Sequence, residues 1–275
     1  MRTLVFAVAC LAAAGIPGSA SAQSQGAAPT APAATAQALQ GVDPALLDEL
    51  AAGSRILADI GVVDAFGHLT VRHPTNPNRF LMSRSLAPAL VTASDIMEFD
   101  LDGNAIDPRG RTVFLERFIH GQIYKARPDV NAVVHSHSPA VIPFSVSSVK
   151  LQAMYHNSAF LAGGVPVFEI RDFGGTTDML VRNNELGAAL AKVLADKPVA
   201  LMRGHGDVAV GPDIRTAVFR AYYTEVGARL QMQAVALGGT VNGLTPEEGV
   251  KADAVNAQIL PRAWELWRRK VSAPQ

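Results

Sequence analysis

Residues 132–138 read Ala-Val-Val-His-Ser-His-Ser. The apolar run at its start predicts a short buried strand over 131–134. Successive side chains of a strand point to opposite faces, so His135 and His137, two positions apart, face the same side. Two imidazole nitrogens can therefore reach one ion.

A third histidine lies in the segment Arg203-Gly204-His205-Gly206, directly after an apolar run over 199–202 that predicts another strand. Glycine on both sides of His205 allows a close approach of the backbone. Three neutral imidazoles with an open position are typical of a catalytic divalent site, whereas structural zinc normally has four ligands, often thiolates. The chain has one cysteine, Cys10. The sequence thus predicts a catalytic metal site.

Apolar periodicity predicts the elements around these histidines. Asp43-Pro44 is a helix start, with Asp43 as the N-cap, and Asp102-Gly103 is a hairpin turn signal within antiparallel sheet. Strands interleave irregularly with helices, so we predict an α/β fold with a mixed sheet covered by helices. The predicted helices span 43–60, 113–126, 178–195, 218–237 and 252–270, and the predicted strands span 69–72, 79–83, 96–101, 131–134, 165–170 and 199–202.

The N-terminal residues predict export. Residues 1–3 carry one positive charge, residues 4–16 form an apolar run too short to span a bilayer, and Ala20-Ser21-Ala22 fits the signal peptidase pattern. We therefore expect a signal peptide over 1–22 and a periplasmic mature protein without membrane attachment. A lipoprotein signal ending at Cys10 is the alternative, but it would leave an apolar region of only a few residues.

Composition bounds the rest of the chain. Residues 23–41 are rich in Ala, Gln, Pro and Thr and predict a disordered linker, which leaves one domain over 42–275. The 24 basic and 24 acidic residues give no net charge that would attract nucleic acid. No glycine-rich nucleotide motif follows a predicted strand, so no organic cofactor is expected.

The segments around the histidines resemble the class II aldolase/adducin family, and the resemblance extends over about residues 45–240. It implies a three-layer αβα fold with a largely antiparallel central sheet, and a homotetramer. It also implies that His135, His137 and His205 are metal ligands, and that Glu116 is the acid/base and a further ligand. The resemblance is strongest in the stretches 116–120, 123–130 and 132–138.

Two loops depart from the sugar-phosphate aldolases of that family. Where those enzymes hold the phosphate, this chain reads Gly67-His68-Leu69-Thr70 and Ser83-Arg84-Ser85-Leu86-Ala87-Pro88. The guanidinium of Arg84 suits a carboxylate, which it can hold by two parallel hydrogen bonds. We predict that Arg84, His68 and Ser85 contact a small carboxylate substrate, and that the chain is similar to the decarboxylase branch.

The predicted activity is that of a metal-dependent carbon–carbon lyase. Decarboxylation leaves an electron pair on carbon that moves onto a neighbouring oxygen, where zinc, manganese or iron can stabilise the resulting enolate. The predicted substrate is a small hydroxylated aromatic or heteroaromatic acid. The alternatives are an aldolase acting on an unphosphorylated hydroxy-keto acid, a non-haem iron oxygenase, and an adducin-like interaction module without a metal.

Overall fold

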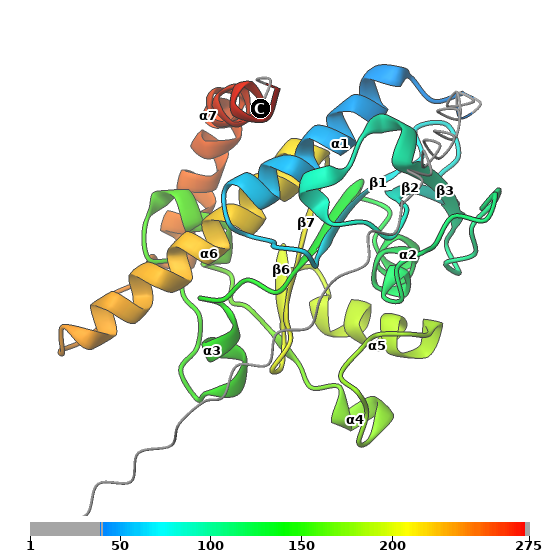
Figure 1. Cartoon of the computed structure of the whole chain (residues 1–275). Coiled ribbons are helices and arrows are strands. Elements are labelled where there is room, and N and C mark those ends of the chain that lie inside the picture. The colour runs from blue at the N-terminus through cyan, green and yellow to red at the C-terminus, as the bar shows by residue number, and fades with distance from the viewer. Residues whose placement is uncertain (1–38, 40, 273–275) are drawn as a thin grey trace, which may run out of the picture. The chain divides into compact units, whose positions relative to one another are not determined.

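The computed structural model describes residue 39 and residues 41–272. The predicted signal peptide, and the predicted linker apart from residues 39 and 41, lie outside the described residues. The described part is built on a seven-stranded sheet of order β3-β2-β1-β4-β7-β6-β5, in which only β5 and β6 pair in parallel (Figure 1). The strands are β1 (His68–Arg72), β2 (Arg79–Ser83), β3 (Ile96–Asp100), β4 (Ala132–Ser136), β5 (Val167–Phe168), β6 (Val199–Met202) and β7 (Gly206–Gly211).

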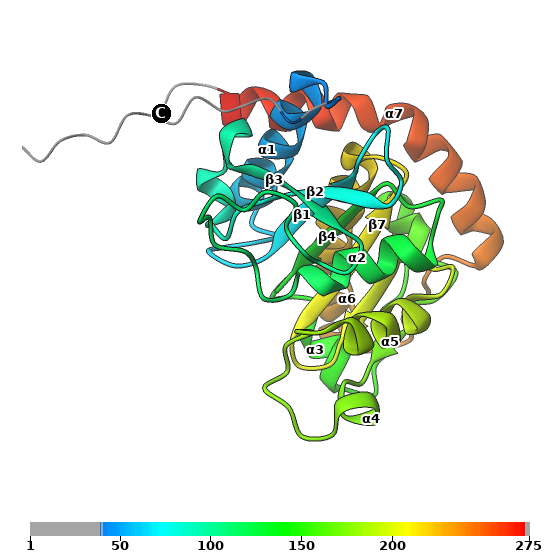
Figure 2. The same ribbon diagram turned by 90° about the vertical axis from the view of Figure 1, so that its right-hand side faces the viewer.

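Helices cover both faces of this sheet. In Figure 2, α2 and α5 lie in front of the strands and α6 lies behind them. On one side pack α1 (Pro44–Asp59), α6 (Ile214–Ala236) and α7 (Pro246–Ser272), and on the other pack α2 (Arg117–Ala126) and α5 (Asn184–Leu194). The remaining helices are short: α3 (Ile142–Val146), α4 (Arg171–Gly174), η1 (Pro88–Leu90), η2 (Ala93–Asp95) and η3 (His156–Leu161).

Two apolar cores result from the alternation of side chains along the strands. In β2, Leu81 belongs to the core under α1 and α6, while its neighbours Phe80 and Met82 belong to the core under α2 and α5. Val133 and Val134 of β4 divide between the two cores in the same way. The predicted three-layer αβα fold with a mixed, largely antiparallel sheet is therefore confirmed.

Helix boundaries differ from the prediction where a capping side chain starts the helix. The predicted start at Asp43 is confirmed, since its carboxylate accepts a hydrogen bond from the Ala45 amide. The helix predicted from 178 begins only after Asn183, and that predicted from 218 begins earlier, after Asp213. The last helix, predicted from 252, begins at Pro246.

The helix predicted over 113–126 begins at Arg117, so Val113 to Glu116 are not helical. Phe114 and Phe118 lie four residues apart, which matches a helical period, but Phe114 contributes to a pocket wall instead. The prediction was therefore wrong for these four residues. Glu116 is the N-cap residue, directly before the helix begins.

Strand β7 was not predicted, and it completes the surroundings of β4. β4 pairs with β1 on one side and β7 on the other, with His135 opposite His68 and Val208. The strand predicted over 131–134 extends to Ser136, so His135 lies within it and His137 just beyond its end. Within the described residues, no helix combines the length and the apolarity that crossing a bilayer requires.

Candidate metal centre

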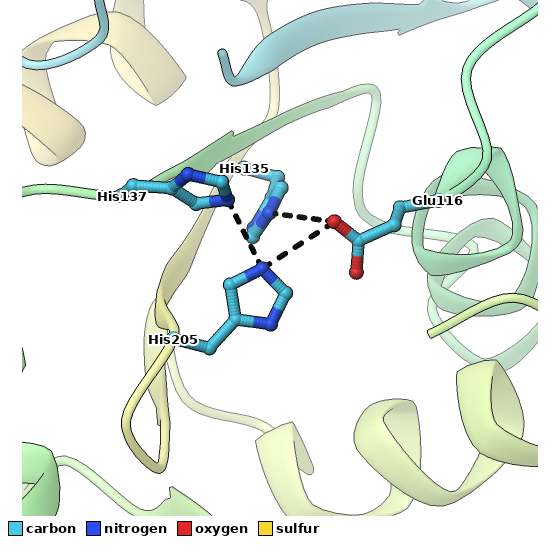
Figure 3. Close-up of side chains that lie close together, drawn as sticks. All are labelled: Glu116, His135, His137 and His205. Atoms are coloured by element: carbon cyan, nitrogen blue, oxygen red, sulfur yellow. Dashed lines mark hydrogen bonds and ion pairs between the residues drawn. The ribbon is translucent and has the colours of Figure 1, made fainter. Parts of the chain in front are cut away.

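Four side chains from three separate segments meet at the end of β4. His135 and His137 come from β4 and its end, His205 from the turn between β6 and β7, and Glu116 from the start of α2 (Figure 3). Each offers one ligand atom, and these atoms all lie within 4.8 Å of one another. The structure thus brings together all four residues that the sequence predicted as a metal site.

The Nε2 atoms of the histidines face the centre of this cluster, as does one oxygen of Glu116. Glu116 Oε2 lies 3.5 Å from Nε2 of His135 and 3.4 Å from Nε2 of His205. Nε2 of His137 lies 3.0 Å from Nε2 of His205 (Figure 3). One cation could therefore contact a nitrogen from each ring and a carboxylate oxygen together.

Backbone carbonyls fix the tautomers of two of the rings. Nδ1 of His135 donates to the Asp207 carbonyl at 3.0 Å, and Nδ1 of His205 donates to the Met179 carbonyl at 3.0 Å. Because a carbonyl only accepts, both hydrogens lie on Nδ1 and each Nε2 keeps a lone pair. A carbonyl that orients the ring in this way is the usual outer partner of a metal-binding histidine.

The buried Nε2 of His135 has no hydrogen-bond partner among the described residues. Leaving a buried polar atom unpaired costs roughly 1–3 kcal/mol. Its lone pair faces the carboxylate of Glu116 and the ring of His205, and lone pairs that converge without a shared hydrogen repel one another. A divalent cation would remove this conflict, so the donor set fits a metal ion.

The protonation states of Glu116 and His137 also suit a cation. Burial disfavours the charged form of Glu116, but the facing imidazoles of His135 and His205 outweigh it and lower the pKa of the carboxyl. Burial, together with His135 and His205, lowers the pKa of His137 to about 4. At neutral pH Glu116 is then ionised and His137 is neutral, which are the forms that coordinate metals.

Two glycines permit the close approach of the surrounding backbone. A Cβ on Gly206 would lie 1.9 Å from the Ser136 carbonyl oxygen, so only glycine fits beside β4 after His205. Gly67 has a φ of +95°, and a Cβ there would lie 2.6 Å from the side chain of Val63. The close approach predicted around His205 is confirmed at Gly206.

A pocket of about 610 Å³ opens above the cluster. Glu116, His135 and His137 form its floor, and His68 and Ser85 also line it. Its wall is apolar, formed by Ala65, Phe66, Leu86, Ala87, Phe114, Leu115 and Leu180.

Arg84, predicted as a substrate contact, is not among the residues that line this pocket. Its Nε donates to Oδ1 of Asp95 at 2.7 Å, and its side chain is about one third exposed. Arg84 is adjacent in sequence to Ser85, which does line the pocket, and its terminal nitrogens are not engaged by Asp95.

Some groups that shape the site were missed at the sequence level. The Val181 amide donates to Oε1 of Glu116 at 2.8 Å, which leaves Oε2 for the cluster. This contact and the two carbonyls that orient the histidines are backbone groups, so no residue type could reveal them. His120 was not predicted as a site residue, although its Nε2 lies 2.6 Å from Nδ1 of His68.

A comparison with family models matches residues 48–232 to the class II aldolase and adducin N-terminal domain. The chain belongs to this family. It is similar in sequence to "Decarboxylase tropJ" of Talaromyces stipitatus, with 37% identity over 242 residues that cover 80% of this chain and 91% of that protein. It is also 31% identical to "3,4-dihydroxyphthalate decarboxylase" of Arthrobacter keyseri, over 82% of this chain and 94% of the relative.

Among solved structures, the chain is similar to the L-fuculose 1-phosphate aldolase from Glaciozyma antarctica. The TM-score is 0.69 at 26% identity, over 83% of this chain and 88% of the other. Decarboxylases and aldolases are both lyases. The predictions of the family, of its decarboxylase relatives and of an enzyme of the lyase class are therefore confirmed.

Proposed function

We propose that this protein is a divalent-metal-dependent decarboxylase of small hydroxylated aromatic or heteroaromatic acids. One observation carries the proposal: three imidazoles and a carboxylate converge in one cluster, and Glu116, His135 and His137 of this cluster form the floor of a pocket whose wall is apolar. The floor suits a cation and oxygen ligands, and the wall suits a flat ring. The decarboxylase names of two relatives support the same reaction class.

His135, His137 and His205 would hold the cation, with Glu116 beside it. A divalent ion there would supply Lewis acidity toward a phenolic oxygen and a neighbouring carboxylate of the substrate. Zinc, manganese and iron all accept imidazole and carboxylate ligands.

Glu116 would move the proton. Its carboxylate, held ionised by its lowered pKa, first takes the hydrogen of the substrate's ortho-hydroxyl group. Glu116 then delivers that proton to the ring carbon that bears the carboxylate, which converts the substrate into a β-keto acid. The carbon–carboxylate bond breaks, carbon dioxide leaves, and the bond's electron pair restores the ring and its phenolate oxygen. Water reprotonates the phenolate on release.

The pocket wall would hold the ring and limit the access of water. Phe66 and Phe114 lie on this wall, and the ring of Phe66 stacks on that of His137 with centroids 6.2 Å apart. Aromatic faces at this position can pack against the ring of an aromatic substrate. Ser85 and Arg84 would contact the substrate's polar groups near the pocket mouth.

A screen of hydroxylated aromatic acids would test the proposal directly. Metal-free protein is loaded with zinc, manganese or iron in turn, and the release of carbon dioxide is measured together with oxygen uptake. The proposal predicts carbon dioxide release without oxygen consumption for at least one acid. Stoichiometric oxygen uptake would favour an iron oxygenase, and cleavage of hydroxy-keto acids alone would favour an aldolase.

We further propose export to the periplasm and assembly as a homotetramer. Export rests on the signal pattern of residues 1–22, and the tetramer rests on the family resemblance. N-terminal sequencing of the protein from a periplasmic fraction should begin near Gln23. Light scattering on the purified protein should give about four times the mass of the mature chain.

A further inference from the structure

A row of buried polar side chains leads away from the pocket, and the proposed ligand set does not use it. Nδ1 of His68 lies 2.6 Å from Nε2 of His120, and Nδ1 of His120 lies 2.8 Å from Oγ1 of Thr70. Oγ1 of Thr70 in turn lies 2.8 Å from the hydroxyl of Tyr124. All four residues are buried, so each of their polar atoms needs a partner.

Two periodicities bring these side chains together. His68 and Thr70 are two residues apart on β1 and face the same side of the sheet. His120 and Tyr124 are four residues apart on α2, which packs on that side. The packing of α2 on β1 therefore makes a row of two histidines followed by two hydroxyls, in which strand and helix residues alternate.

The geometry indicates that both histidines in the row are neutral. Nδ1 of His68 and Nε2 of His120 lie 2.6 Å apart, so one nitrogen donates and the other accepts, and the burial of both rings disfavours a charged form. Each ring thus carries one hydrogen and one lone pair. The direction of every hydrogen bond in the row is then linked to that of the next.

The hydrogen bonds of the row can all point one way or all point the other way, but the two arrangements do not satisfy the polar atoms equally well. If the Tyr124 hydroxyl donates to Thr70, Thr70 can donate to Nδ1 of His120, and Nε2 of His120 then donates to Nδ1 of His68. All three bonds lie between 2.6 and 2.8 Å. In the reverse direction the Thr70 hydroxyl turns away from His120. It can then donate to the Val133 carbonyl only at 3.5 Å. If it donates to the Tyr124 oxygen at 2.8 Å instead, the buried Tyr124 hydrogen has no acceptor among the described residues.

The favoured direction places the single hydrogen of His68 on Nε2. His68 lines the pocket, and no described residue forms a hydrogen bond with this nitrogen. Its ring centroid lies 5.1 Å from that of His135, so the donor would lie beside the proposed cation site.

We propose that the Tyr124–Thr70–His120 row fixes His68 as a neutral hydrogen-bond donor toward a carboxylate or hydroxyl oxygen of the substrate. His120 and Thr70 are then positioning residues that act through His68. The tautomer of His68 is independent of the reaction, whereas its contact with a substrate oxygen rests on the proposed function.

The tautomer can be read directly by nitrogen NMR of the zinc-loaded full chain labelled with ¹⁵N-histidine. The signals of His68 are assigned by their loss in His68→Asn. The expected result is a protonated Nε2 and an unprotonated Nδ1 on His68. A hydrogen on Nδ1 would overturn the proposal, whether or not the protein turns over any acid.

Thr70→Val and Thr70→Ser form a matched pair for the second step. Valine keeps the shape of threonine and removes the hydroxyl, so Thr70→Val should give a mixture of His68 tautomers. It should also raise KM about twofold for an equal mixture, because only the fraction with the hydrogen on Nε2 can donate to the substrate. Thr70→Ser keeps the hydroxyl and should retain the wild-type tautomer and KM. Equal tautomers and equal KM in both variants, at unchanged zinc content, would contradict the role of the row.

Salicylate separates a failure of this inference from a failure of the proposed function. This probe is a small hydroxylated aromatic acid, and its binding to the wild-type protein can be followed whether or not it is decarboxylated. Its binding should shift the Nε2 hydrogen signal of His68. Binding that leaves this signal in place would overturn the donor role, while an inactive protein that shows the shift would contradict only the decarboxylase proposal.

Discussion

The floor of the pocket is built on strands and a helix start, whereas its wall is built from loops. His135 on the floor is fully buried, and its ring is held by a backbone carbonyl. On the wall, Phe66 is 64% exposed and Leu115 is 58% exposed. A rigid floor fixes the geometry of the reacting atoms, and an exposed wall can change its side chains without disturbing the fold. The floor residues therefore determine which reaction occurs, and the wall residues determine which substrate binds.

The largest effect on activity should come from a substitution in the pocket floor. Glu116→Gln keeps the size of the side chain and the acceptor for the Val181 amide, but it can no longer exchange a proton. We expect the rate of carbon dioxide release to fall roughly 10²- to 10⁴-fold. The three histidines should still bind metal, as measured by elemental analysis. Unaltered turnover would contradict the acid/base role of Glu116.

A substitution in the pocket wall should change substrate binding alone. Phe66→Ala removes apolar area from the pocket, and losing contact with about 60 Å² of a ring costs about 1.5 kcal/mol, or about tenfold in KM. Metal content should stay unchanged. Leu90→Ala is the control, because Leu90 is 65% exposed and does not line the pocket. A fall in kcat without a rise in KM for Phe66→Ala would remove the distinction between wall and floor.

The buried row beside the floor should make stability depend on pH. The pKa values of His68 and His120 lie well below 6.5 in the folded chain, mainly through burial. The unfolded chain therefore binds up to two more protons as the pH falls below about 6.5. The free energy of unfolding should then decrease by roughly 1.4 kcal/mol per pH unit for each proton.

Urea unfolding of metal-free protein at several pH values between about 5 and 7 would measure this slope. His120→Phe removes one of the two titrating groups and should give a shallower slope. An equal slope in the two proteins would show that His120 does not titrate abnormally.

The smallest effect on activity should come from a substitution of Arg84, next to the pocket residue Ser85. Arg84 is bound to Asp95 through Nε, and its remaining nitrogens are proposed to contact the substrate carboxylate. Arg84→Lys keeps the charge but loses the planar fork, so KM should rise a few-fold while kcat stays the same. Asp95→Asn removes the charge that pairs with Arg84, and also alters the hydrogen bonds from Thr92, and should change KM less. If neither variant changes KM, Arg84 is a surface ion pair and not a substrate contact.

The floor could be predicted from sequence because residue type and strand period act together there. The His-Ser-His spacing and the glycines around His205 identify ligands without knowledge of the fold. β7 was missed because its sequence, Gly-Asp-Val-Ala-Val-Gly, begins and ends with residues typical of turns. Its strand conformation depends on pairing with β4 and β6, which is a tertiary effect.

The wall and the buried row could not be predicted in the same way. Phe114 has the spacing of a helical residue, yet it lies before the helix and faces the pocket. His68 and His120 are 52 residues apart, and nothing in either local sequence indicates that they share a hydrogen bond. Such contacts arise from the packing of α2 on β1 and require the structure.

Metal content tests the central claim most directly. Purified protein, loaded with zinc, manganese or iron and then dialysed, should retain about one ion per chain. His137→Ala removes one ligand at the least buried of the three rings while leaving the strands intact, and it should retain far less. A wild-type protein that holds none of these ions, or a variant that holds as much as the wild type, would contradict the account.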